Sequence, residues 1–254
     1  MSNTGFLGRA DRDGAIPGLG GTPGRGLRVH AVLALLLLTG LNVLLVQYIP
    51  FQIKGLRDNY LIFFYHFPSA INTFVFYGAM LVASIQYLRR RDPVWDLRAR
   101  VAAEIGVLSN GVLLVTGMTW AKAAWGHWWI WNDPRLLSAA VMSLVYVGYL
   151  VLQRSIEEDE KRCRYAAVLG ITAFVTVPFV HFAIKLLGEQ HHPMQLDEMS
   201  SDASIIRTRW YGVLAFFSLY LLVYRWRFDK EFLRLETAEA LARVRALEDK
   251  AARP

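Results

Sequence analysis

Six long apolar segments, separated by short polar stretches, follow one another along most of this chain. They cover residues 29–49, 67–88, 101–119, 136–153, 166–186 and 210–224. A helix needs about 20 predominantly apolar residues to cross a bilayer. Hydrophobic residues also make up 54% of the 254 positions, which is typical of polytopic membrane proteins. The pattern therefore predicts an all-α fold with six transmembrane helices.

Few polar side chains interrupt these segments. Glu104 lies near the start of the third and Lys185 near the end of the fifth, as expected when a charge at the bilayer centre costs about 2.5–3.5 kcal/mol. Asn42, Asn72 and Asn110 lie further inside. Because an amide in the membrane interior needs a partner, we expect these three side chains to form hydrogen bonds between helices.

The segments before and after this region differ in character. Residues 1–28 are rich in Gly and Pro and lack an apolar period, which predicts a flexible tail. The first apolar segment is long enough to span the membrane, so a cleaved signal peptide is not expected. Residues 227–254 are charged and carry leucines near helical spacing, so we expect a helix there, either solvated or bound to a partner. Residues 29–226 form the transmembrane domain between them.

The basic residues predict the orientation. Of the 28 Lys and Arg side chains, 21 fall in residues 1–28, 89–100, 154–165 and 225–254. The positive-inside rule then places these segments and both termini in the cytoplasm. We expect an integral protein of the cytoplasmic (inner) membrane. The net charge of +7 follows from this topology and from contact with membrane lipid, so no nucleic-acid partner is needed to explain it.

Tryptophan gathers between the third and fourth apolar segments, on the predicted outer side. Five of the eight tryptophans lie there, at Trp120, Trp125, Trp128, Trp129 and Trp131. Tryptophan favours sites with one apolar side and one wet side, such as a membrane interface or the rim of a flat ligand. An aromatic belt predicts Trp at both interfaces, whereas this clustering in one loop favours a ligand platform. Gly126 allows close approach, and Lys122, Asp133 and Arg135 add charge.

Two histidines fall on the same predicted side. His66 lies at the start of the second segment and His191 after the fifth. Neutral imidazoles bind iron, and two facing each other suit the axial positions of a heme, although a histidine at an interface is more often only solvated. His192 is the rival to His191, and His127 also lies near the tryptophans. For His181 we expect a buried, hydrogen-bonded role.

At this point the residues match a family. Residues 116–138, TGMTWAKAAWGHWWIWNDPRLLS, resemble the tryptophan-rich WWD signature of heme-handling membrane proteins, most closely the cytochrome c maturation protein C (CcmC) type. Residues 65–70, YHFPSA, resemble the family's first outer histidine and the turn after it. The interval from Pro178 to His191 reproduces the spacing to its second outer histidine. The resemblance covers residues of about 30–225, with residues 120–138 as the WWD loop.

The resemblance implies a heme-delivery subunit without a catalytic residue of its own. It implies that heme b is held noncovalently at the periplasmic face, with His66 and His191 as axial ligands. The implied partners are the ABC transporter components CcmA and CcmB, a CcmD-type small membrane protein and a CcmE-type heme chaperone. Lys122 and Arg135 have the chemistry to meet the propionates. The residues expected to contact heme are Trp120, Lys122, Trp125, Gly126, Trp128, Trp129, Trp131, Asp133 and Arg135.

The sequence departs from the family pattern at three points, one of which is Leu137 where Thr is typical. Asn132 is inserted between the last Trp and Asp133, which either rotates Asp133 and Arg135 relative to the rings or bulges out harmlessly. The second histidine stands in Glu-Gln-His-His rather than Thr-Leu-His-Gln, so its assignment rests on spacing.

Two alternative functions stay open. One is a synthase-type enzyme that attaches heme to apocytochrome c, which the short chain disfavours. The other is a membrane b-type cytochrome in electron transfer, which needs histidine pairs deep within the spans. Cys163 is the only cysteine, so the chain has no Cys-x-x-Cys-His heme-attachment motif.

Overall fold

The computed structural model describes residues 23–46, 61–187 and 203–251, and all regular structure in them is helical. The helices are α1 (Pro23–Val46), α2 (Phe63–Arg90), α3 (Pro93–Trp125), α4 (Pro134–Ser155), α5 (Asp159–Ala173), α6 (Thr176–Leu187) and α8 (Ala203–Ala251). By length and composition, five stretches are able to cross a membrane, namely 26–46, 63–90, 93–125, 134–155 and 159–183. The prediction of an all-α polytopic membrane protein is confirmed.

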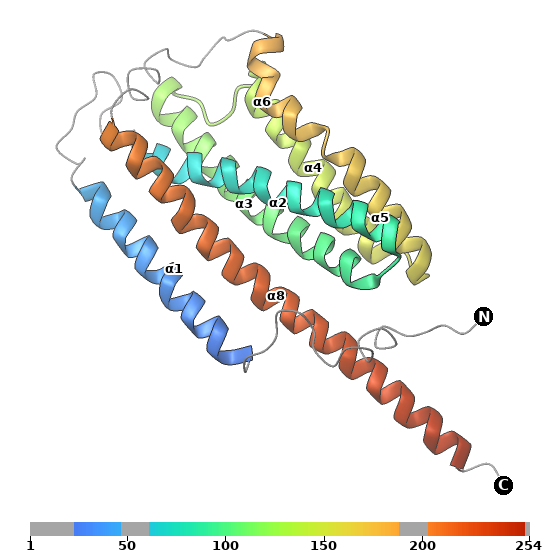
Figure 1. The fold of residues 1–254 in the computed structure, drawn as a ribbon. Coiled ribbons are helices and arrows are strands. Elements are labelled where there is room, and N and C mark those ends of the chain that lie inside the picture. The colour runs from blue at the N-terminus through green and yellow to red at the C-terminus, as the bar shows by residue number, and fades with distance from the viewer. Residues whose placement is uncertain (1–22, 47–60, 188–202, 252–254) are drawn as a thin grey trace.

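The sixth predicted span, residues 210–224, lies within α8 (Figure 1). This helix is continuous over 49 residues, so no boundary separates the span from the charged helix predicted after residue 226. It packs against α1 and α2, and its C-terminal part extends beyond the bundle (Figure 1). Between Gly212 and Ala251 the sequence has neither Gly nor Pro, so nothing stops the helix where the apolar segment ends.

The tight connection between α2 and α3 is set by local chemistry. Arg91 adopts the left-handed conformation, with φ of 54°, and its N–H donates to the Tyr87 carbonyl. The next residue, Asp92, accepts a hydrogen bond from the Val94 N–H as the N-cap of α3, and Pro93 occupies the first helical position. An αL residue followed by Asp-Pro closes one helix and opens the next within two residues.

The fifth predicted span is two helices. α5 ends at Ala173 and α6 begins at Thr176, whereas the apolar pattern predicted one segment over 166–186. Pro178 accounts for the break, because it has no N–H and its ring clashes with the carbonyl of the residue four positions earlier, here Phe174. The chain tightens around that carbonyl, which accepts instead from the Val177 N–H at 3.0 Å.

The three asparagines inside the spans form hydrogen bonds between helices, as predicted. Asn42 on α1 accepts from the Tyr65 hydroxyl of α2 at 2.9 Å. Asn72 on α2 donates to the Val213 carbonyl of α8 at 3.2 Å. Asn110 on α3 donates to the Ser143 hydroxyl of α4 at 2.8 Å. Each bond links a different pair of helices, so together they fix the bundle where apolar packing alone has little directionality.

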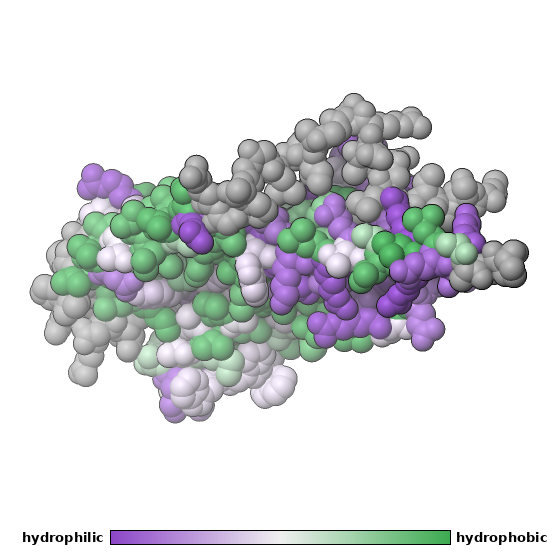
Figure 2. Space-filling view, turned by 90° about the horizontal axis from the view of Figure 1, so that it is seen from below, coloured by the Kyte–Doolittle hydropathy of each residue, from purple (hydrophilic) through white to green (hydrophobic). Residues whose placement is uncertain are grey.

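The apolar surface of the bundle is the membrane-facing one. Large hydrophobic side chains point outward along α1, such as Val29, Leu35 and Val43, each at least 65% exposed. Figure 2 shows one side of the molecule with hydrophobic residues over much of its length and hydrophilic residues gathered toward one end. This distribution fits a protein whose solvent is lipid over the spans and water at the ends.

Candidate functional site

Those predicted site residues that the structure describes gather at one end of the bundle. The contact between His66 at the start of α2 and Thr116 near the end of α3 places both at this end, which also holds the start of α4. Arg89–Arg91 lie at the opposite end, where α2 stops and α3 starts. The tryptophans and His66 therefore lie opposite the basic cluster, as the positive charge pattern predicted.

The tryptophan segment is shorter as a loop than predicted. α3 continues to Trp125, so Trp120, Lys122 and Trp125 belong to its last turns, and only residues 126–133 are non-helical. Hydrophobicity falls after Thr119, but three alanines follow, and Ala is the strongest helix former. Gly126 ends the helix with φ of 80°, a conformation that Gly adopts without strain.

The five tryptophans have different environments. Trp120 packs against the hydrophobic core around Leu41 and Phe64, which gives it a structural role. Trp128 and Trp131 are 54% and 78% exposed. Trp129 is half-buried, its ring meets that of Trp131 edge-on at 5.8 Å, and its indole N–H is buried without a hydrogen-bond partner among the described residues. The exposed rings and this unused donor distinguish residues 128–131 from the core aromatics.

Lys122 and Asp133 cap the two helices that border the loop. The Lys122 ammonium donates to the Gly126 carbonyl at 2.9 Å, at the C-terminus of α3. Asp133 is buried and accepts from the backbone N–H groups of Arg135 and Leu136, both at 2.9 Å, as the N-cap of α4. These contacts give both residues a structural task, since each charge complements the helix dipole.

The inserted Asn132 is accommodated within the loop. It is exposed, in a turn at residues 131–132, and the Asp133 N–H still bonds to the Ile130 carbonyl at 3.2 Å. The cap of α4 therefore forms with the extra residue in place. Arg135 is half-buried in the first turn of that helix.

His66 is held by Thr116 in a defined tautomer. The His66 Nδ1 atom lies 3.0 Å from the Thr116 hydroxyl, and that hydroxyl lies 2.7 Å from the Val112 carbonyl. A hydroxyl has one proton, and a carbonyl only accepts, so Thr116 donates to Val112 and accepts from His66. The neutral His66 ring therefore carries its proton on Nδ1, and Nε2 has the lone pair.

Gly117 makes room for the same ring. A Cβ atom at this position would lie 3.2 Å from Cε1 and 3.7 Å from Nδ1 of His66. The imidazole thus rests directly on the α3 backbone. Sequence analysis did not single out Thr116 or Gly117, because their pairing with His66 spans 50 positions and no local pattern reports it.

Arg209 is a third residue of this site that the sequence pattern did not indicate. It lies in the first turns of α8, and its guanidinium carbon is 4.8 Å from the centre of the Phe67 ring. Its Nε atom is buried without a hydrogen-bond partner among the described residues. The sequence signal for Arg209 was its position directly before the sixth apolar segment, at the end of the bundle that has few other basic residues.

The remaining histidines lie in four places, and the first of them, His127, is exposed in the loop between α3 and α4. His181 is exposed on α6, with its ring 4.9 Å from that of Phe182, so the expectation that it is buried is wrong. His181 lies three residues after Pro178. The helix break before this proline determines which face of α6 packs against the bundle. His30 lies at the basic end, 3.1 Å from Arg225, away from this site. His191 and His192 lie outside the described residues.

Comparison with known proteins agrees with this arrangement. The family model described as heme exporter protein C matches residues 24–243. The heme exporter protein C of Bradyrhizobium diazoefficiens is 31% identical over 176 residues, which cover 68% of this chain and 66% of that protein. The protein of the same name from Paracoccus denitrificans is 32% identical over 186 residues, 72% of this chain and 77% of its own length. This chain belongs to the heme exporter protein C family.

Proposed function

We propose that this protein binds heme b noncovalently at its tryptophan-rich end and passes it on during cytochrome c maturation. The observation that carries the proposal is the state of His66. Thr116 holds the ring so that Nε2 keeps the lone pair. A metal-ligating histidine needs one nitrogen with a lone pair for the metal and a hydrogen-bond partner at the other nitrogen that fixes the ring orientation.

The surrounding residues fit a large flat anionic ligand. Trp128 and Trp131 present exposed aromatic surface, on which a porphyrin face can stack. The unused donors of Trp129 and Arg209 are chemically suited to the propionate carboxylates, and a charged donor forms the stronger bond. Lys122 and Asp133, by contrast, support the loop by capping its helices.

The chain would act by holding and releasing its ligand. Heme, when bound, supplies an iron that takes one ligand on each face of the ring. His66 would provide one, and we propose His191 for the other, on the strength of the family spacing alone. The exposure of Trp128 and Trp131 leaves the ligand open to a partner protein from the loop side. No described residue needs to form a covalent bond for such a transfer.

We further propose that this end faces the periplasm. The support is the concentration of arginine at the other end, which the positive-inside rule places in the cytoplasm. The proposed partners are CcmA, CcmB and a CcmD-type protein in the membrane, and a CcmE-type chaperone as the acceptor of heme. The relatives' name, heme exporter, supports this assignment.

The electron-carrier alternative is not favoured by the geometry. A membrane b-type cytochrome needs histidines that face one another between helices. Among the described residues, His30, His66 and His181 each lie toward one end of a span, and His181 is exposed on α6.

Heme loading of purified protein tests the proposal. The protein should bind heme with a six-coordinate, low-spin absorption spectrum. His66→Ala should lower occupancy or give a five-coordinate spectrum, whereas His30→Ala, at the opposite end, should change neither. A His66→Ala variant with wild-type spectrum and affinity would overturn the assignment.

A further inference from the structure

A hollow lies at the end of the bundle opposite the tryptophans, between α3, α4 and α8. It has a volume of about 220 Å³ and is mostly polar. Four arginines and two glutamates line it, which gives the lining a formal excess of two positive charges. The lining residues are Arg100, Glu104, Leu150, Gln153, Arg154, Arg227, Glu231 and Arg234.

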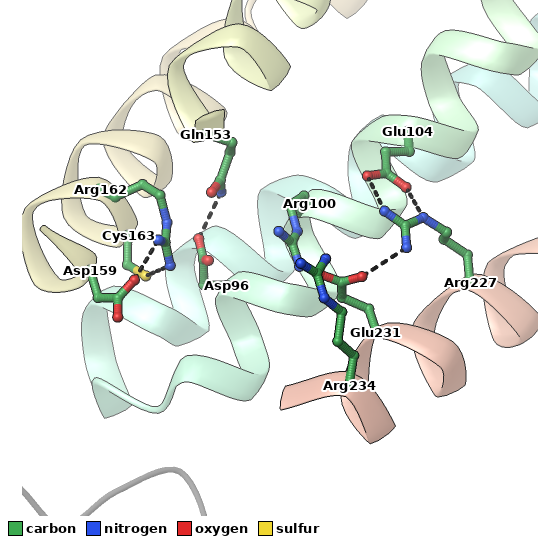
Figure 3. A network of polar contacts seen from close by, with 10 residues as sticks. All are labelled: Asp96, Arg100, Glu104, Gln153, Asp159, Arg162, Cys163, Arg227, Glu231 and Arg234. Atoms are coloured by element: carbon green, nitrogen blue, oxygen red, sulfur yellow. Dashed lines mark hydrogen bonds and ion pairs between the residues drawn. The ribbon is translucent and has the colours of Figure 1, made fainter. Parts of the chain in front are cut away.

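The glutamates in this hollow are already engaged. Figure 3 shows Glu104 facing Arg227, which donates to both carboxylate oxygens, at 2.8 and 3.2 Å. Glu231 accepts from Arg227 at 3.0 Å and from Arg100 at 3.1 Å. These pairs join α3 to α8, and they neutralise two of the four arginines in the lining.

The lining also holds guanidinium donors that have no partner, or only a long contact, among the described residues. Arg154 of α4 is exposed and has no ion-pair or hydrogen-bond partner among the residues that the structure describes. The Nε atom of Arg100 is buried and also has no partner there. Arg234 is 78% exposed and makes one long contact of 3.5 Å to Glu231. The lining therefore keeps guanidinium groups available for an external anion.

The hollow lies where the apolar surface of the bundle ends. Val151 and Val147, one and two turns before Arg154 on α4, are 57% and 41% exposed, and Leu150 lines the hollow itself. Trp226 of α8, next to Arg227, is 50% exposed, as is common for Trp at the membrane interface. An anion bound here would be at the depth of lipid headgroups, with apolar surface for acyl chains beside it.

We propose that this hollow binds the phosphate of an anionic phospholipid. Guanidinium groups match phosphate oxygens with paired hydrogen bonds, and basic pockets between transmembrane helices on the cytoplasmic side bind anionic headgroups. Arg154 is the main contact, with Arg100 and Arg234 beside it. The bound lipid would join α4 to α3 and α8. At this level Glu104 and Glu231 already join α3 to α8 through their ion pairs.

Lipid binding by the full chain tests this proposal. Delipidated protein in a neutral detergent is titrated with phosphatidylglycerol, phosphatidylcholine and inorganic phosphate, with binding measured by native mass spectrometry. Phosphatidylglycerol should bind, and Arg154→Gln should weaken it about tenfold, as expected for the loss of one charge-assisted contact of about 1.4 kcal/mol. Arg245→Gln, on the exposed C-terminal part of α8, is the matched control and should bind like wild type.

Three outcomes would overturn the proposal. Equal binding of phosphatidylcholine would show that the headgroup charge is not recognised. Displacement of the lipid by an equal concentration of inorganic phosphate would make the hollow a site for free anions. Unchanged affinity in Arg154→Gln would place the lipid elsewhere. Because Arg154 is exposed and makes no described contact, this variant should fold normally, and a thermal melt verifies that it does.

Discussion

Replacing Thr116 by Val tests the link between the fold and the proposed ligand most directly. Valine has nearly the same shape but cannot accept a hydrogen bond from the His66 Nδ1 atom, which lies 3.0 Å from the Thr116 hydroxyl oxygen in wild type. A hydrogen bond of this kind contributes about 0.5–1.5 kcal/mol net. Its loss should therefore reduce the preference for the Nδ1–H tautomer by about two- to tenfold, since 1.4 kcal/mol is a factor of ten. Through the tautomer alone, heme affinity should fall by up to this factor.

The assay has two parts. Nitrogen-15 NMR of histidine-labelled, heme-free protein reports which nitrogen of His66 carries the proton, and a heme titration reports affinity. Thr116→Ser keeps the hydroxyl and should match wild type in both. Outer partners of metal-ligating histidines typically contribute 10- to 100-fold in metal affinity, so a loss larger than tenfold would mean that Thr116 also fixes the ring orientation.

The two parts of the assay separate two errors. An unchanged His66 tautomer in Thr116→Val would refute the hydrogen-bond argument itself. A changed tautomer with unchanged heme affinity would leave that argument standing and refute His66 as a heme ligand.

Three further changes have defined outcomes. Gly117→Ala places a Cβ about 3.2 Å from the His66 ring, so the heme spectrum should shift while the amount of protein in the membrane stays the same, as measured by absorbance and immunoblot. Trp131→Ala should weaken heme binding several-fold with little loss of stability, because stacking contributes about 0.5–1.5 kcal/mol, whereas Trp120→Ala should mainly lower the melting temperature. Burial alone would raise the pKa of Glu231, but the hydrogen bond from Arg227 and the nearby arginine charges outweigh it and lower the pKa. The carboxylate therefore stabilises the fold above its ordinary pKa of about 4.3, and this stabilisation is lost as pH falls through the lowered pKa. Glu231→Gln should have a lower melting temperature than wild type at neutral pH and the same melting temperature as wild type in acid.

The sequence was most informative where the cause is local. Apolar length identified the spans because the membrane acts on each segment separately, and the asparagines within the spans had to find partners. The break at Phe174 was also readable in principle, since Pro178 is printed in the sequence. Hydropathy did not predict that α3 extends to Trp125, because the residues after Thr119 favour a helix by propensity and not by hydrophobicity.

The pattern of residues along the chain did not predict contacts between distant segments. The bond from His66 to Thr116 and the ion pair of Glu104 with Arg227 connect positions 50 and 123 apart. Whether two such residues meet depends on how the helices pack, which a single sequence does not report. For the same reason, Asp133 was assigned to the ligand from its place in a motif, while its hydrogen bonds are those of a helix cap.

The continuity of α8 has a mechanical consequence. Its 49 residues correspond to a rod of about 74 Å, whereas a bilayer with its headgroups is about 40–45 Å thick. The rod therefore emerges from the membrane by about 30 Å if its other end lies at the interface. At Gly212 it rests on Pro68, two residues after His66, with no space for a Cβ between them. An uninterrupted helix bends only gradually. A protein that binds the emerging part of α8 and tilts it would therefore also move the part that contacts α2, the helix that carries His66.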